Sequence, residues 1–204
     1  MRVGVLGAGV VGHTLAGKLR ELGHDVSIGT RSPRDGALTY ADAAAAGTDL
    51  IVNATAGAAS LEALDAAGAA NLAGKVLLDV ANALDFSKGR PPALTVANDD
   101  SLGEQIQRAH PEAKVVKALN TVNNAVMVNP ALVPGQHVVF VCGNDDGAKA
   151  QVVELLGSFG WPRERIVDLG DISNARGPEM YVALWIRLMG TLGTPNFNIV
   201  LEHA

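Results

Sequence analysis

The fold is decided by the first stretch of the chain, M-R-V-G-V-L-G-A-G-V-V-G at residues 1–12. The apolar run at 2–6 is typical of a buried strand, and a helix is predicted over 10–22 because Leu15 and Leu19 share one face. The glycines between them form the pattern G-x-G-x-x-G. That pattern is weak alone, but between a strand and an amphipathic helix it indicates a dinucleotide-binding loop.

Each glycine of this loop has a physical role. Gly7 permits a tight turn, Gly9 lets the backbone approach a pyrophosphate, and Gly12 lets the helix pack closely on the strand. Amides at the start of the helix then face the phosphates. The alternative is a glycine-rich turn with no ligand. We expect the loop to bind nucleotide through Gly7, Ala8, Gly9, Val10, Val11 and Gly12.

Strand-like and helix-like segments alternate along the rest of the chain. Strands are predicted at 2–6, 25–28, 50–54, 76–80, 114–119, 138–142 and 166–169, and helices at 10–22, 40–46, 61–72, 101–110, 146–159 and 173–192. Repeated βα units require a doubly wound, mostly parallel Rossmann sheet, an α/β fold. The segment 81–97 has little periodicity and is predicted to be a loop. We expect a nucleotide-binding domain over 1–170 and a short helical cap over 171–204.

The end of the second strand reads Thr30-Arg31-Ser32-Pro33-Arg34. NAD-binding folds usually place an acid there for the ribose 2′-hydroxyl, and this chain has none at that point. Hydroxyls and guanidiniums can instead hold a 2′-phosphate, at about 1.5–3 kcal/mol for a charge-assisted hydrogen bond. We therefore expect NADP(H), bound here by Thr30, Arg31, Ser32 and Arg34. The alternative is a solvated basic loop.

Three later strand ends should line the same crevice, since ligands bind at the carboxyl ends of such strands. Small side chains there would let the nicotinamide ribose approach, and Asn and Thr side chains can bond its hydroxyls and amide. Each could instead be an ordinary turn residue. The expected set is Ala54, Thr55 and Ala56, then Val80, Ala81 and Asn82, then Asn120, Thr121 and Asn123.

The sequence offers no catalytic or metal motif. There is no G-x-S-x-G or H-E-x-x-H, the five histidines are scattered, and the one cysteine, Cys142, is expected to be a small buried hydrophobe. Reducing a ketone needs a proton donor near its oxygen. Passing a hydride between two redox rings mainly needs stacking at roughly 3–3.5 Å. We therefore predict no catalytic side chain, no metal, and a flat, cofactor-sized second substrate.

Composition limits the partners. The net charge is −5 and no basic run exists, which argues against nucleic acid. The longest apolar helical stretch, 180–190, is too short for a bilayer, and a strand starting at residue 2 leaves no room for a leader, so we expect a cytoplasmic protein. That stretch is apolar nearly all round and should be buried on most sides, in a homodimer interface, a pocket roof or plain core.

These residues resemble the F420-dependent NADP oxidoreductases. The similarity lies in the opening M-R-V-x-V-L-G-A-G, in G-T-R-S-P, V-C-G-N-D-D and D-L-G-D-I, and in the closing L-G-T-P-N-F-N. It implies hydride transfer between NADPH and the deazaflavin coenzyme F420, which would stack over the nicotinamide. The chain departs from the archaeal members at Ala56-Gly57 and at Asn120-Thr121-Val122-Asn123. The N-terminal half is also similar to the reductase domain of STEAP metalloreductases.

Two other functions remain open. One is an NADPH-dependent reductase of FMN, FAD or a quinone-like acceptor on the same scaffold. The other is a non-enzymatic NADP(H) sensor, which would bind the nucleotide and turn nothing over. A screen of acceptors with NADPH separates the three.

Arg31→Ala should raise the KM for NADPH far more than it lowers kcat, because the 2′-phosphate is remote from the transferred hydride. Steady-state kinetics with varied NADPH measures both. An equal fall in kcat at unchanged KM would refute this role for Arg31.

Overall fold

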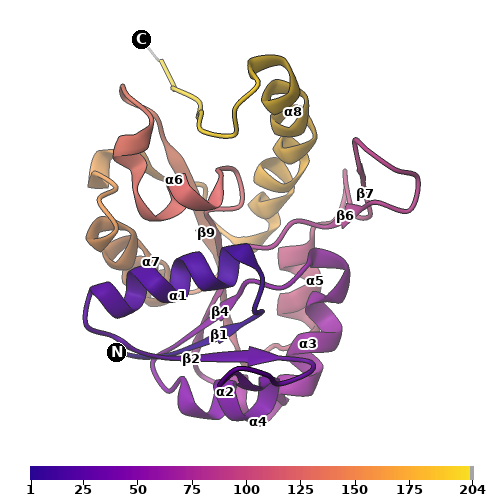
Figure 1. The fold of residues 1–204 in the computed structure, drawn as a ribbon, viewed down its shortest axis with the longest axis vertical. Coiled ribbons are helices and arrows are strands. Elements are labelled where there is room, and N and C mark those ends of the chain that lie inside the picture. The colour runs from indigo at the N-terminus through magenta and orange to yellow at the C-terminus, as the bar shows by residue number, and fades with distance from the viewer. Residues whose placement is uncertain (203–204) are drawn as a thin grey trace.

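An eight-stranded sheet forms the centre of the computed structural model, which describes residues 1–202 (Figure 1). Its strands are β1 (Arg2–Leu6), β2 (Asp25–Thr30), β3 (Leu38–Thr39), β4 (Leu50–Asn53), β5 (Val76–Asp79), β8 (Lys114–Ala118), β9 (Val139–Gly143) and β10 (Ile166–Asp168). Their order is β10-β9-β8-β5-β4-β1-β2-β3, and all neighbours are parallel except β8 and β9. The predicted doubly wound, mostly parallel α/β fold is confirmed.

Helices connect the strands and cover both faces of the sheet. They are α1 (Val10–Glu21), α2 (Tyr40–Ala46), α3 (Ser60–Ala67), α4 (Ala69–Leu72), α5 (Leu102–Ala109), α6 (Asn124–Val128), α7 (Asp146–Ser158) and α8 (Arg176–Leu192). Short 3-10 turns are η1 (Gly57–Ala59), η2 (Pro130–Leu132), η3 (Arg163–Arg165) and η4 (Ile172–Ala175).

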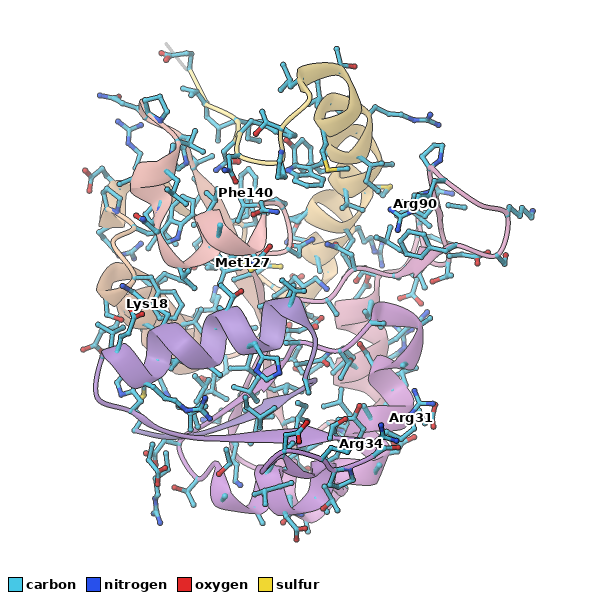
Figure 2. The ribbon with its side chains drawn as sticks, in the orientation of Figure 1. Lys18, Arg31, Arg34, Arg90, Met127 and Phe140 are labelled. Atoms are coloured by element: carbon cyan, nitrogen blue, oxygen red, sulfur yellow. The ribbon has the colours of Figure 1, made fainter. Side chains whose placement is uncertain are left out.

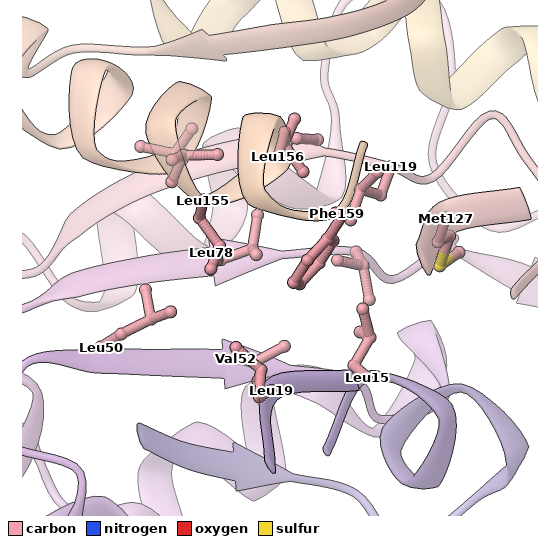
Figure 3. Close-up of a cluster of buried hydrophobic side chains, with 14 of the residues drawn as sticks. Leu15, Leu19, Leu50, Val52, Leu78, Leu119, Met127, Leu155, Leu156 and Phe159 are labelled. Carbon is pink, nitrogen blue, oxygen red and sulfur yellow. The ribbon is translucent and has the colours of Figure 1, made fainter. Parts of the chain in front are cut away.

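Two hydrophobic clusters fill the space between the sheet and its helices. Leu50 and Val52 of β4 join the cluster under α1 and α7, whereas Ile51 between them joins the cluster under α2, α3 and α5 (Figure 3). This alternation follows from the two-residue repeat of a strand, whose side chains point to opposite faces. A sheet buried on both faces explains why these strands read as continuous apolar runs.

Several local predictions hold and two do not. The helix predicted over 101–110 is confirmed as α5, and the Ser101 hydroxyl caps it by accepting the Glu104 N–H at 3.1 Å. The helix predicted over 61–72 is instead two helices, because Gly68 adopts a φ of 90° between them. The loop predicted over 81–97 contains an antiparallel ribbon of β6 (Leu84–Asp85) and β7 (Ala93–Leu94). Strands of two residues are too short to show a periodicity.

The order of the strands positions a crevice. From β1 the chain passes to β2 on one side of β1 and then to β4 on the other. The connections therefore leave β1 and β4 in opposite directions, and an opening forms at the carboxyl ends of these strands. The glycine-rich loop lies at this point, directly after β1.

Helix α8 rises from the body of the protein, and the chain then returns from its end across the top (Figure 1). Its buried residues are Pro178, Glu179 and Val182, near its start, while Leu184 and Leu192 are each 55% exposed. Our expectation that this helix is buried on most sides is wrong for the single chain, because it packs mainly through its first turns. Residues 203–204 of the predicted cap segment lie outside the described part of the chain. Within residues 1–202, no helix combines the length and apolarity needed to cross a bilayer.

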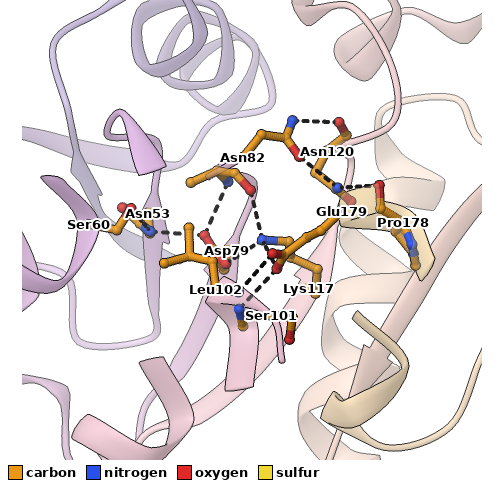
Figure 4. Close-up of polar contacts among 12 residues, drawn as sticks. Asn53, Ser60, Asp79, Asn82, Ser101, Leu102, Lys117, Asn120, Pro178 and Glu179 are labelled. Atoms are coloured by element: carbon orange, nitrogen blue, oxygen red, sulfur yellow. Dashed lines mark hydrogen bonds and ion pairs between the residues drawn. The ribbon is translucent and has the colours of Figure 1, made fainter. Parts of the chain in front are cut away.

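A buried ammonium group anchors the start of α8. Lys117 of β8 is fully enclosed, and its Nζ lies 2.7 Å from Asp79 Oδ2, 2.8 Å from Glu179 Oε1 and 2.7 Å from the carbonyl oxygen of Ala81 (Figure 4). Glu179 also accepts the N–H groups of Leu102 and Gly103 at the start of α5, at 2.7 and 2.9 Å. One lysine thus ties β8, β5, α5 and α8 together beneath the crevice.

The charges of this group support one another. Burial lowers the pKa of Lys117, but the carboxylates of Asp79 and Glu179 outweigh that effect and hold its pKa above the ordinary value. The negative charge of the second carboxylate, Glu179, is stabilised by the backbone N–H groups at the N-terminus of α5, where a negative charge is favoured.

Lys117→Met should lower the free energy of unfolding by about 3–5 kcal/mol, because it leaves two carboxylates buried without their cation. Urea unfolding followed by tryptophan fluorescence measures this change.

Lys114→Met is the matched control on the same strand. Lys114 pairs with Asp145 at 3.1 Å in a partly exposed bridge, so its loss should cost less than about 1 kcal/mol. Equal stabilities of the two variants would show that the buried group does not anchor the fold.

Candidate functional site

The glycine-rich loop has the geometry that its sequence predicts. Gly7 has a φ of 116°, and a Cβ on it would lie 2.5 Å from the Ala54 carbonyl oxygen. A Cβ on Gly12 would collide with the carbonyl oxygen of Gly7. A Cβ on Gly9, by contrast, would have no atom within 4 Å. Two glycines therefore serve packing, while the third leaves open space above the loop.

The start of α1 carries free hydrogen-bond donors. Gly9 caps the helix without any side-chain hydrogen bond, and the first turn contains no acidic residue. Val10, at the first helical position, is 73% exposed. The first amides of a helix have no partner within it, so this exposed end fits an anion.

Two hollows flank the end of β2. The first, which we call the Arg31 hollow, has a volume of about 140 Å³ and lies between Arg31 and Tyr40 on one side and Ala63 and Ala66 of α3 on the other. The second, the Arg34 hollow, has a volume of about 550 Å³ and lies between α1 and the segment 32–38. Thr30 lines both.

The predicted 2′-phosphate residues are thus divided between these hollows. Ser32 and Arg34 line the larger one, whereas Arg31 lines the smaller one. Figure 2 shows Arg31 and Arg34 at the same edge of the molecule. The larger hollow also includes His13 and Arg20 of α1, two residues outside the predicted site. His13 is exposed, as expected for a surface helix position, and the helical repeat brings it beside the glycine loop.

The third hollow, the central crevice, has a volume of about 460 Å³ and lies at the carboxyl ends of β4, β5 and β8. It brings together most of the strand-end residues that the sequence predicts. These are Ala54, Thr55, Ala56, Val80, Ala81, Asn82, Asn120 and Asn123, with Val11 of the glycine loop. Thr121 does not line it: this side chain is buried, and its hydroxyl has no partner among the described residues.

Other walls of the crevice come from distant segments. Leu84 and Phe86 reach it from the β6–β7 ribbon, Met127 from α6 and Trp185 from α8. The Trp185 ring stacks on Phe197 at 5.3 Å between centroids. No local sequence pattern predicts that these residues line the crevice. The aromatic residue Trp185 in the predicted cap helix is the sequence feature that could have indicated a roof.

The C-terminal segment holds this roof in place. The Asn198 side-chain amide donates to Nδ1 of His137 at 2.9 Å and to the carbonyl oxygen of Val138 at 2.7 Å. The Ile199 carbonyl accepts the Val138 N–H at 3.1 Å. Phe197 is therefore fixed against Trp185 by the bonds of the residues that follow it.

Two asparagines cross-link the floor of the crevice. The Asn82 amide donates to the backbone carbonyl of Asn120 at 2.8 Å, and the Asn120 amide donates back to Asn82 Oδ1 at 3.0 Å (Figure 4). The Asn120 amide also donates to the carbonyl of Pro178 in α8, at 3.0 Å. The ends of β5 and β8 and the start of α8 are thus held at fixed positions.

Comparisons with known proteins point to one family. The family model for coenzyme F420-dependent NADP oxidoreductases matches residues 2–83, the part that contains the glycine loop and the end of β2. A crystal structure from Arthrobacter sp. FB24, described as a "putative f420 dependent nadp-reductase", is 53% identical over the whole of both chains, with a TM-score of 0.95. The chain belongs to the F420-dependent NADP oxidoreductase family.

The chain also matches two curated relatives, but only over part of the length of each. The F420-dependent NADP reductase of Methanocaldococcus jannaschii is 31% identical over 118 residues, which cover 57% of this chain and 52% of that protein. Metalloreductase STEAP3 of Rattus norvegicus is 28% identical over 205 residues, which cover 95% of this chain and 38% of that protein. The chain thus spans about half of the first relative and about two fifths of the second.

Gly9→Ala should weaken NADPH binding about tenfold or more at nearly unchanged stability. The backbone there is extended, with φ −83° and ψ −176°, and the new methyl meets no protein atom, so only an approaching pyrophosphate would encounter it. Fluorescence titration with NADPH and urea unfolding give the two quantities.

Two glycines of the same helix serve as controls. Gly12→Ala should lose about 1–3 kcal/mol of stability through its collision with Gly7. Gly17→Ala, which meets nothing within 4 Å, should keep its affinity and gain up to about 1 kcal/mol. Wild-type affinity in Gly9→Ala would contradict the proposed pyrophosphate position.

Proposed function

We propose that this family member transfers a hydride between NADP(H) and the deazaflavin coenzyme F420. The observation that carries the proposal is the chemistry of the central crevice. Among the described residues that line it there is no Asp, Glu, His, Lys, Cys or Tyr. Its walls are aliphatic and aromatic side chains, neutral amides and the Thr55 hydroxyl, together with backbone.

That composition suits one class of reaction. Reduction of a carbonyl or imine is helped by a side chain that donates a proton to the developing charge. Hydride exchange between two redox rings requires instead that the rings be held face to face with water excluded. Lys117, which is buried beneath the floor, has its charge satisfied by Asp79 and Glu179. The composition of the crevice therefore supports a role in positioning rings.

The nucleotide would lie along the three hollows. Amides at the start of α1 would hold the pyrophosphate, and Ser32, Arg34 and Thr30 would hold the 2′-phosphate in the Arg34 hollow. Arg31, which we expected at the 2′-phosphate, lines the neighbouring Arg31 hollow instead, where its guanidinium would cover the adenine against the alanines of α3. When bound, NADPH supplies the hydride. The residues of the central crevice orient the nicotinamide and exclude water.

The second substrate would enter between the nicotinamide and the roof. Trp185, Phe86 and Met127 offer apolar and aromatic surface for a flat ring system. The F420-dependent reductase of M. jannaschii and the Arthrobacter structure are named for F420, which supports this coenzyme as the partner of the reaction.

A flavin is the second candidate acceptor. The similarity to rat STEAP3 extends over 95% of this chain. A flavin ring has the same flat shape and would use the same walls. NADP(H) binding is common to both candidates, so the acceptor alone distinguishes them.

We also propose a division into two domains and a homodimer. The chain would divide into a nucleotide-binding domain over 1–170 and a cap from residue 171 onward. The exposed apolar side chains of α8, Leu184 and Leu192 among them, would form the contact of a homodimer.

The decisive experiment mixes the protein with NADPH deuterated at C4 and with F420, FMN, FAD or a quinone at equal concentration. We expect F420 to be reduced fastest, with deuterium carried to its ring, because the hydride passes directly to a ring carbon, where it does not exchange with water, while the accompanying proton comes from solvent. Absorbance gives the rate and mass spectrometry gives the label.

Each alternative has its own result. Faster reduction of FMN or FAD would replace F420 with a flavin. Tight NADPH binding without reduction of any acceptor would contradict both reactions and favour a nucleotide sensor.

A further inference from the structure

The side chain of Asn120 is placed with unusual constraint. The residue before it, Leu119, is fully buried and has a φ of 63°, in the left-handed region that L-residues rarely adopt. Such a conformation persists only where its surroundings determine it, and it concentrates at binding sites. Here it turns the chain at the end of β8 so that Asn120, itself 4% exposed, lines the central crevice.

The orientation of the Asn120 amide group follows from its partners. The carbonyl of Pro178 can only accept a hydrogen bond, so the nitrogen of Asn120, 3.0 Å away, must face it. The second N–H of the same nitrogen goes to Asn82 Oδ1, also at 3.0 Å. Both donors are therefore used, and the group cannot flip without placing two oxygens against each other.

The oxygen of that amide is left as a free acceptor. Among the described residues, none donates to Asn120 Oδ1, and this atom is not one of the fully enclosed partnerless atoms, which include the hydroxyl of Thr121. Asn124 also lines the crevice and has no donor to its Oδ1 among the described residues, but it is only half-buried and its amide is held by Thr14 alone. The remaining polar side chains make other bonds. Thr55 donates its hydroxyl to Asn53 at 2.7 Å, and Asn123 accepts the Ala125 N–H at 3.0 Å.

We infer that Asn120 Oδ1 accepts an N–H of the nicotinamide carboxamide and thereby fixes which face of the ring is turned toward the second substrate. The inference rests on the proposed binding of NADP(H). The carboxamide is the N–H donor at this end of the nucleotide, and a fixed acceptor-only oxygen is its natural partner. Because the Asn120 nitrogen is bonded to Pro178, the start of α8 sets the position of this contact.

The test compares NADP⁺ with its 3-acetylpyridine analogue, in which a methyl group replaces the carboxamide NH₂. Calorimetry gives the Kd of each for the wild type and for Asn120→Ala. The wild type should prefer NADP⁺ about three- to tenfold, as expected for one hydrogen bond, and Asn120→Ala should reduce that preference to less than about twofold.

Two controls make the result specific. Asn124→Ala changes a crevice residue whose amide donates to Thr14, and it should keep the wild-type preference. All variants should bind 2′,5′-ADP, which lacks the nicotinamide, with wild-type affinity, which also reports that they are folded.

The outcomes separate the two levels of the proposal. Equal binding of NADP⁺ and its analogue by the wild type overturns the inference, whatever the variant does. An undiminished preference in Asn120→Ala also overturns it, and a selective loss of F420 or FMN binding there would assign Oδ1 to the second substrate. If the wild type binds neither NADP⁺ nor 2′,5′-ADP, the proposed function fails, and the inference with it.

Discussion

The enclosed charge of Lys117 is the constraint on which the arrangement of the site depends. An ammonium without solvent must meet acceptors at close range, and here they come from β5, from the backbone after β5 and from α8. A buried ion pair contributes little net stability compared with apolar packing, but it tolerates few alternative arrangements. We infer that this ion pair serves to position the site. The floor of the crevice and the helix α8 that carries its roof are both held in place by contacts with one atom, Lys117 Nζ.

The two ends of the proposed nucleotide site differ in how far apart in the sequence their residues lie. The phosphate end is local, because a strand, a glycine turn and a helix N-terminus lie within 20 residues of one another and form the binding geometry together. The nicotinamide end is non-local. It requires Asn82, Asn120 and Pro178 to meet across three segments, and it requires Trp185 to be held by Phe197 and by the segment that follows it.

This difference explains what the sequence could predict. Apolar runs located the main strands, the spacing of Leu15 and Leu19 located the first helix, and the glycine spacing located the loop between them. The sequence did not predict the β6–β7 ribbon, the short helix α6 or the break at Gly68, because segments of two to five residues are too short to show a hydrophobic periodicity.

Cys142 is buried as predicted, and burial raises the pKa of its thiol to about 12. Lys117, a charged residue inside an apolar strand, and Asp79, the acid at the end of β5, are the sequence features that indicate the buried ion pair. The exposure of α8 could not be predicted for another reason. An apolar composition shows that a helix is hydrophobic, but it does not show which other segments cover its surface.

The central claim is that one NADP(H) molecule spans the three hollows, from the segment after β2 to the amide of Asn120. A crystal structure of the complex with NADP⁺ measures this directly. The account predicts the pyrophosphate on the amides at the start of α1, the 2′-phosphate beside Ser32 and Arg34, and the carboxamide beside Asn120. A nucleotide bound elsewhere, or one whose 2′-phosphate lies in solvent away from both arginines, would contradict it.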